Sequence, residues 1–187
     1  MELLAVPRIG GEIHYYSYII VPDFSPATSL LDLRGKRFGS ADLMSNTVWL
    51  YPMVWLREQG EDPKRLFGQH RITGSHDRAI EALARGHLDG VAVGSLVYDY
   101  MVVEDPVLGK TTRVILTSPP FGMPTFVTHP NTDASLREDI LRIFLDMQNS
   151  EEGIEVLFHL SFEQFDLPDS EAYDGVRLAA SVVARSE

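Results

Sequence analysis

The sequence predicts an α/β layered fold. Apolar segments typical of strands alternate along the chain with amphipathic segments typical of helices, and this alternation favours a sheet covered by helices. The 187 residues contain no internal repeat and no low-complexity stretch. With 44% hydrophobic residues, the chain has enough apolar material for one domain or two small lobes.

The first half of the chain begins with strands and continues into a helix. Its expected extended segments, rich in branched and aromatic residues, are 3–6, 15–21 and 36–38. Residues 23–29 form a loop or linker, and residues 48–56 form an apolar helix. Pro52 lies inside this helix and predicts a kink or a displaced start. The six-residue spacing of Trp49 and Trp55 favours packing in the core.

In the second half, a short strand at 70–73 leads into a helix that Ser75 caps and Gly86 ends. Its apolar residues recur at the spacing of one helical face: Ile80, Leu83, Ala84 and Leu88. Further strands are expected at 90–94 and 113–117. The remaining segments are predicted to be helical: 96–103, 133–148, 153–160 and 173–184.

The composition excludes several classes of function. A net charge of −11 argues against non-specific binding to nucleic acid, which requires a face rich in lysine and arginine, but it leaves room for a small anion held by neutral donors. There is no cysteine, so disulfide and thiolate chemistry are absent. No apolar stretch approaches the ~18 residues of a membrane span. The first residues lack the pattern of a secretory signal, so we expect either a cytosolic chain or an export signal outside this sequence.

Two junctions between a strand and a helix stand out as candidate binding elements. One is Ser45-Asn46-Thr47 and the other is Ser75-His76. Each places hydroxyl groups, free backbone N–H groups and the positive end of a helix dipole at the carboxyl end of a strand, where open α/β sheets bind ligands. If the two junctions converge, they form an oxyanion site.

The sequence also resembles a known family. The motifs that carry the resemblance are LLDLRGKRF at 30–38, SNT at 45–47, TGSHD at 73–77, LDGVA at 88–92, SPPFGMP at 118–124 and YDGVR at 173–177. Their order and spacing are similar to those of the PhnD-like phosphate, phosphite and phosphonate-binding proteins of ABC transporters. The resemblance covers essentially the whole chain but lacks roughly the N-terminal third of a full-length member, a domain-sized piece of ~90 residues.

The resemblance implies a type II periplasmic-binding fold, in which two α/β lobes close on a ligand by hinge motion. Residues 1–28 would be a remnant of lobe 1 with the first crossover strand, and 29–117 a complete lobe 2 with a parallel or mixed sheet flanked by helices. Residues 118–187 would be the return crossover and the C-terminal helices of lobe 1. If Met1 is the true start, apolar faces of lobe 1 lack their cover, and we expect self-association or instability.

The family's anion contacts carry over onto six residues: Tyr15, Ser45, Asn46, Thr47, Ser75 and His76. Asn46 replaces a hydroxyl residue of the family's Ser-Thr-Ser motif, and His76 would donate from its ring to a ligand oxygen. Members that bind aminoalkyl phosphonates hold the amine with acidic residues near the end of the second lobe and in the return segment. In the return segment this chain has no acidic residue at 120–124. The resemblance therefore implies a ligand without an amine, such as phosphite, phosphate or methylphosphonate.

The expected function is that of the solute-binding component of an ABC transporter, which captures a small phosphorus oxyanion without catalysis, cofactor or metal. Its partners would be that oxyanion and a membrane permease, and its location periplasmic or extracytoplasmic, with the cytoplasm left open by the absent signal. Two alternatives remain: a sensory or interaction domain of the same fold, and an enzyme resembling menaquinone-pathway proteins that acts on a carboxylate. The other histidines share no spacing typical of a metal site.

Overall fold

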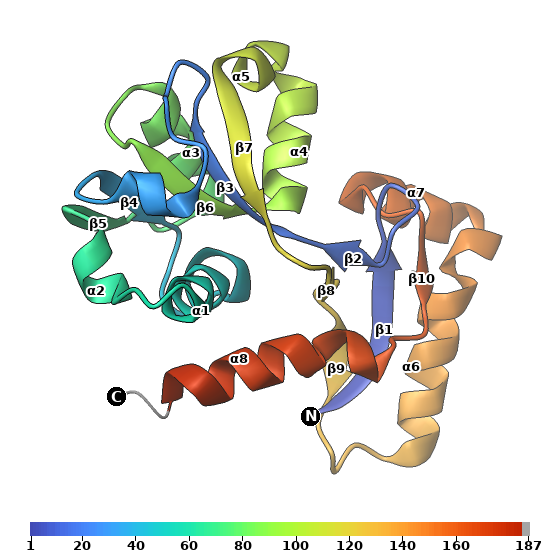
Figure 1. Cartoon of the computed structure of the whole chain (residues 1–187). Coiled ribbons are helices and arrows are strands. Elements are labelled where there is room, and N and C mark those ends of the chain that lie inside the picture. The colour runs from blue at the N-terminus through green and yellow to red at the C-terminus, as the bar shows by residue number, and fades with distance from the viewer. Residues whose placement is uncertain (185–187) are drawn as a thin grey trace. The chain divides into compact units, whose positions relative to one another are not determined.

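The computed structural model describes residues 1–184, which divide into two compact units. Unit 1 combines Met1–Tyr15 with Pro120–Asp174, and unit 2 combines Tyr16–Pro119 with the segment that starts at Gly175 (Figure 1). Helix α8 (Asp174–Ala184) begins where unit 1 ends. None of the described helices is long and apolar enough to cross a membrane.

Unit 2 is built on a five-stranded mixed sheet with the order β5-β4-β6-β3-β7. The strands are β3 (Ser17–Pro22), β4 (Arg37–Ser40), β5 (Gln69–Ile72), β6 (Gly90–Gly94) and β7 (Thr112–Thr117). Strand β4 runs parallel to both β5 and β6, whereas β3 is antiparallel to β6 and β7. The carboxyl ends of β4, β5 and β6 therefore meet at one edge, together with the beginning of β3.

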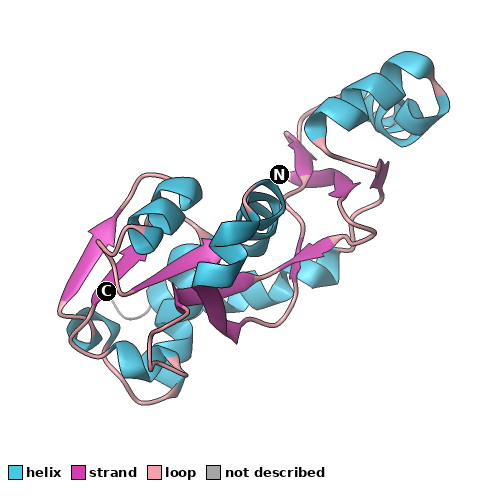
Figure 2. Cartoon of the chain, turned by 90° about the horizontal axis from the view of Figure 1, so that it is seen from above, coloured by secondary structure: helices cyan, strands magenta, loops and turns pink. Residues whose placement is uncertain are grey.

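Helices cover both faces of this sheet (Figure 2). The helices of unit 2 within residues 16–119 are η1 (Leu30–Leu33), α1 (Tyr51–Glu58), α2 (Pro63–Leu66), α3 (His76–Ala84), α4 (Ser95–Glu104) and α5 (Pro106–Thr111). Consecutive residues of β3 point to opposite faces: Ile19 packs with η1, α1 and α2, and Ile20 packs with α3, α4 and α5. Both side chains are fully buried, so the two faces of the strand contribute to two separate hydrophobic cores.

The helix predicted at 48–56 starts later than its apolar pattern does. A π-turn, η2 (Asn46–Leu50), precedes α1, and Pro52 lies in the first turn of α1. Because proline has no N–H to donate to the carbonyl four residues before it, a displaced start is the expected outcome. Trp49 and Trp55 both pack against the core, as predicted.

Unit 1 contains a three-stranded antiparallel sheet, β10-β1-β9, and a two-stranded pair, β2-β8. Its elements are β1 (Glu2–Arg8), β2 (His14–Tyr15), β8 (Phe121–Gly122), β9 (Phe126–Thr128), α6 (Ala134–Asp146), η3 (Met147–Asn149), α7 (Glu151–Leu160), β10 (Gln164–Asp166) and η4 (Ser170–Tyr173). Its core forms around Leu4, Ala5, Leu157 and Phe165, with Phe144 packed against it.

The structure differs from the sequence pattern in two places. The single strand expected at 15–21 is divided at Tyr16, because the backbone N–H of Tyr16 donates to the hydroxyl of Ser95 and its carbonyl accepts from the Ser95 N–H. The three short strands β8, β9 and β10 were not predicted. They have two or three residues each, too few for an alternating pattern to show.

Candidate functional site

The carboxyl edge of the unit 2 sheet brings three helix N-termini together. Strand β4 leads to η2 and α1, strand β5 leads to α3, and strand β6 runs directly into α4. The first N–H groups of a helix have no partner within the helix, so this edge presents several backbone donors. The edge lies where parallel strands end, which is the usual position of ligands in open α/β sheets.

The segment Ser45-Asn46-Thr47 forms the first of these junctions. Ser45 has an extended backbone before the π-turn, and its hydroxyl oxygen lies 3.4 Å from that of Thr47. The hydroxyl of Ser17, at the start of β3, donates to the carbonyl oxygen of Thr47 at 2.5 Å. Ser17 and Thr47 are both buried, so this bond anchors the junction to the sheet.

Asn46 differs from its neighbours in that its side-chain amide is buried and has no partner. Both Oδ1 and Nδ2 are inaccessible to solvent and make no hydrogen bond within the described part of the chain. A buried polar group without a partner is rare, because its lost hydration is not replaced. The unpaired amide therefore lowers the stability of the chain.

His76, the first residue of α3, has its ring orientation and tautomer set by the neighbouring strand. The backbone N–H of Gly94, at the end of β6, donates to His76 Nδ1 at 2.9 Å. A backbone amide can only donate, so Nδ1 carries no proton and the neutral ring carries its proton on Nε2. No described residue accepts a hydrogen bond from Nε2, which leaves an N–H donor for a ligand.

Burial lowers the pKa of His76, since removal from water disfavours the charged ring. The carboxylates of Asp42 and Asp77 oppose this shift and raise the pKa, but desolvation is the larger cause. The neutral ring is also the form that accepts the Gly94 N–H. His76 is therefore neutral at physiological pH, and its ring donates through Nε2–H without needing a second proton.

Gly94 is the point at which the two junctions meet. A Cβ atom at this position would lie 3.4 Å from His76 Cε1 and 3.5 Å from Thr47 Oγ1, so both side chains flank the same α-carbon. Ser17 lies directly opposite Gly94 in the register of β3 and β6. The structure thus brings His76 and Thr47 together, although they are far apart in the sequence.

The other two predicted contacts are placed differently. Ser75 caps α3 with an extended backbone, and a hydrogen bond from its side chain is the main cause of the lowered pKa of Asp77. Tyr15 belongs to unit 1, where it pairs with Phe121 in the β2-β8 ladder and their ring centroids are 6.1 Å apart. A ligand contact from either residue stays a prediction.

Sequence reasoning missed the roles of Gly94 and Ser17. Gly94 ends a buried strand immediately before a helix, and a glycine at such a position is a signal of close approach by other groups. Ser17 carries no comparable signal, because its importance lies in a bond to the carbonyl of Thr47, thirty residues away in the chain. Among the residues described, no cluster of three or more His, Cys, Asp or Glu side chains could hold a metal ion.

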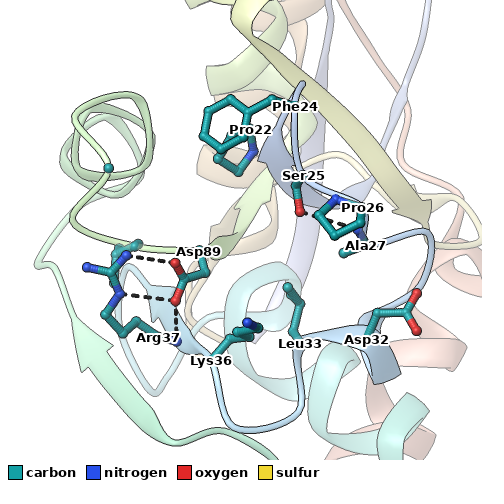
Figure 3. A pocket seen from close by; sticks show the side chains of 12 residues that line it. Pro22, Phe24, Ser25, Pro26, Ala27, Asp32, Leu33, Lys36, Arg37 and Asp89 are labelled. Carbon is teal, nitrogen blue, oxygen red and sulfur yellow. Dashed lines mark hydrogen bonds and ion pairs between the residues drawn. The ribbon is translucent and has the colours of Figure 1, made fainter.

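A hollow of about 490 Å³ in unit 2 lies at the opposite edge of the sheet, where β4 and β6 begin (Figure 3). Three of the four charged side chains that line it, all but Lys36, form hydrogen bonds or ion pairs. Arg37 and Asp89 form a two-pronged ion pair at 2.7 and 3.0 Å, and the carboxylate of Asp32 accepts from the backbone N–H groups of Thr28 and Ser29.

The fold is an α/β fold whose sheet presents backbone and side-chain donors at the carboxyl ends of its parallel strands, where such sheets usually bind ligands. Residues 1–173 match the family described as "ABC transporter, phosphonate, periplasmic substrate-binding protein". The match covers most of the chain, which therefore belongs to this family. The resemblance drawn from the motifs is confirmed, as is the class of binding protein rather than enzyme.

Solved structures confirm the fold class. The binding protein component of an ABC phosphonate transporter from Pseudomonas aeruginosa has a TM-score of 0.81 at 20% identity, over 95% of this chain and 61% of that one. XAC2383 from Xanthomonas citri bound to ATP has a TM-score of 0.80 at 18% identity, over 98% and 71%. PhnD1 from Prochlorococcus marinus in complex with methylphosphonate has a TM-score of 0.76 at 16% identity, over 98% and 72%. This chain thus spans only part of the length of these proteins.

Proposed function

We propose that this chain belongs to the solute-binding component of an ABC transporter and captures a small phosphorus oxyanion without an amine, such as phosphite, phosphate or an alkylphosphonate. The contacts would come from Ser45, Thr47 and His76, with Asn46 beside them. Ser75 and Tyr15 keep their predicted places in the contact set. The partner would be the membrane permease of the same transporter, and the location would be extracytoplasmic.

The observation that carries this proposal is that His76 and Thr47 lie on either side of Gly94, with His76 oriented by the Gly94 N–H. A backbone donor occupies Nδ1, so the ring keeps an unpaired Nε2–H, and the ring and the buried Thr47 side chain both flank Gly94. Neutral donors and helix dipoles suit an anion that must be released again, because they bind it without a permanent ion pair. Capture of this kind requires no general base and no nucleophile.

Two lobes would close on the ligand, as the expected division into 1–28, 29–117 and 118–187 implies. Closure would exclude water from the edge of the sheet and strengthen each hydrogen bond to the anion. Apart from Tyr15, the predicted contacts all come from residues 16–119. Lobe 2 would therefore supply the part of the site that recognises the phosphoryl group.

Titration calorimetry tests the proposal, with phosphite, phosphate, methylphosphonate, aminoethylphosphonate, sulfate and chorismate as ligands. We expect saturable binding of a phosphorus oxyanion that His76→Ala weakens by about 1.5–3 kcal/mol, or roughly 10- to 150-fold, for the loss of a hydrogen bond to a charged group. His87→Ala, an exposed histidine outside the site, is the matched control and should bind as the unaltered protein does. Absence of binding, or equal loss in both variants, would contradict the proposal.

A further inference from the structure

The hollow of unit 2 at the edge where β4 and β6 begin has an apolar floor and a polar rim. Its floor consists of the buried residues Pro22, Ala27, Leu33 and Leu88. Its volume of about 490 Å³ lies within the range of ~300–1,000 Å³ that is typical of sites for small organic molecules. The candidate oxyanion site lies where these strands end, so the hollow is separate from it.

Phe24 stands at the rim of the hollow on a loop whose backbone is held in place. Its side chain belongs to a residue with 88% of its surface exposed, and it lies across the hollow from Lys36 (Figure 3). The guanidinium of Arg113 donates to the carbonyls of Ser25 and Ala27 at 2.7 and 2.6 Å, which fixes the segment next to the ring. A ring that is presented by an ordered loop loses little freedom when a flat apolar ligand covers it.

Lys36 is the unpaired charge of the rim. Both carboxylate oxygens of Asp89 accept hydrogen bonds from Arg37, and the carboxylate of Asp32 accepts from two backbone N–H groups. The ammonium group of Lys36, in contrast, forms no hydrogen bond or ion pair within residues 1–184. The carboxylates of the rim are therefore already satisfied, and a cation is left over for a ligand.

The single free ammonium group favours a ligand with one negative charge. Lysine is a compact point charge, which one carboxylate group can pair with. A phosphoryl group carries about two charges and pairs best with guanidinium forks or several backbone N–H groups. The floor and the ring of Phe24 favour hydrocarbon, and a flat aromatic body makes a larger contact with both than a single alkyl chain does.

We infer that the hollow is a second binding site of this chain and takes a small aromatic carboxylate. The aromatic body lies on the apolar floor against Phe24, and the carboxylate pairs with Lys36. This inference does not depend on the proposed function, because the two sites share no residue.

An NMR titration of nitrogen-labelled protein with naphthoate tests the inference. We expect saturable binding of one naphthoate per chain with a Kd of about 1 mM or tighter, as is usual for a ligand of this size. The backbone amide signals that shift should belong to residues 24–27, 33–37 and 86–89, which surround the hollow. Naphthalenemethanol, which has the same aromatic body without the charge, should bind more weakly.

Two variants separate the contributions of the charge and of the ring. Lys36→Met keeps an apolar stem and should weaken naphthoate binding about two- to fivefold without changing the binding of naphthalenemethanol. Phe24→Ala should weaken the binding of both ligands about two- to tenfold. Lys64→Met and Phe158→Ala, at exposed positions outside the hollow, are the matched controls and should change neither. Thermal unfolding verifies that each variant is folded.

Several results would overturn the inference. Absence of saturable naphthoate binding, or amide shifts concentrated outside the hollow, would remove the site. Equal affinities for naphthoate and naphthalenemethanol would contradict the role of Lys36, and equal losses in the control variants would mean unspecific adhesion. Loss of naphthoate binding in His76→Ala would place the carboxylate in the oxyanion site instead. The titrations with oxyanions test only the proposed function.

Discussion

Alanine at position 94 tests the geometry of the site without disturbing the fold. Gly94 has φ −77° and ψ 138°, a conformation that alanine adopts without strain. The added Cβ would lie 3.4 Å from His76 Cε1 and 3.5 Å from Thr47 Oγ1, which are contact distances rather than collisions. A glycine-to-alanine change at a compatible position stabilises by about 0.4–1 kcal/mol through the unfolded chain. We therefore expect the unfolding temperature to change by only a few degrees, about 2–4 °C per kcal/mol.

The Gly94→Ala change should affect the affinity for the ligand far more than the free energy of unfolding. The proposed anion oxygen would accept from both His76 and Thr47 and would lie about 2.7–3.0 Å from each donor. The new methyl group would stand against both side chains and would crowd that oxygen. Loss of one charge-assisted bond corresponds to about 1.5–3 kcal/mol, so we expect Gly94→Ala to weaken oxyanion binding by at least about tenfold.

Calorimetry and thermal unfolding of the same preparations provide the measurement. Gly175→Ala is the control, since an added Cβ there meets open space. Unchanged affinity in a folded Gly94→Ala protein would refute the placement of the anion between His76 and Thr47. A loss of several kcal/mol in stability would instead show that the packing around Gly94 is tighter than these distances imply.

Three further predictions concern stability. Burial lowers the pKa of both His76 and His70, so the unfolded chain binds more protons than the folded chain at mildly acidic pH. The free energy of unfolding should therefore fall as the pH drops through about 6.5 and level off below the folded pKa values. Urea unfolding at several pH values would show this, with a smaller slope in His76→Gln. Asn46→Leu should raise the free energy of unfolding of the ligand-free protein by about 1–3 kcal/mol, because it removes two buried groups without partners. If urea unfolding gives a lower free energy instead, the amide is paired. Ser17→Ala should cost about 0.5–1.5 kcal/mol through loss of the bond to the Thr47 carbonyl, measured in the same way, and no change would show that the bond contributes nothing.

The fold of unit 2 could be predicted from the sequence because its patterns are long and clear. The buried run at 90–94 and the amphipathic helix that ends near Gly86 both occur as expected, and Gly86 has the positive φ of +72° that a helix end favours. The short strands of unit 1 could not be predicted, because two or three residues carry no periodicity. Their pairing depends on partners far along the chain, as β1 with β9 and β10 shows.

The candidate site was predictable in its residue types but not in its geometry. The hydroxyl and amide residues at 45–47 and the histidine at 76 are local signals, because each stands where a helix begins. Their convergence at Gly94 depends on β4 lying between β5 and β6, which no local pattern encodes. The same holds for the tautomer of His76, which a backbone N–H from another strand determines.

The sequence by itself determined the α/β class, the family and the chemical character of the donors, since periodicity, motif order and side-chain types are properties of the chain alone. Only the tertiary structure decided which donors share a point in space and which polar groups are left without a partner. The physical reason is that hydrogen-bond saturation and burial depend on neighbours supplied by distant segments. His76 and Asn46 illustrate this. The sequence gives their residue types and their places at helix starts, whereas the free Nε2–H and the unpaired amide result from the assembled sheet.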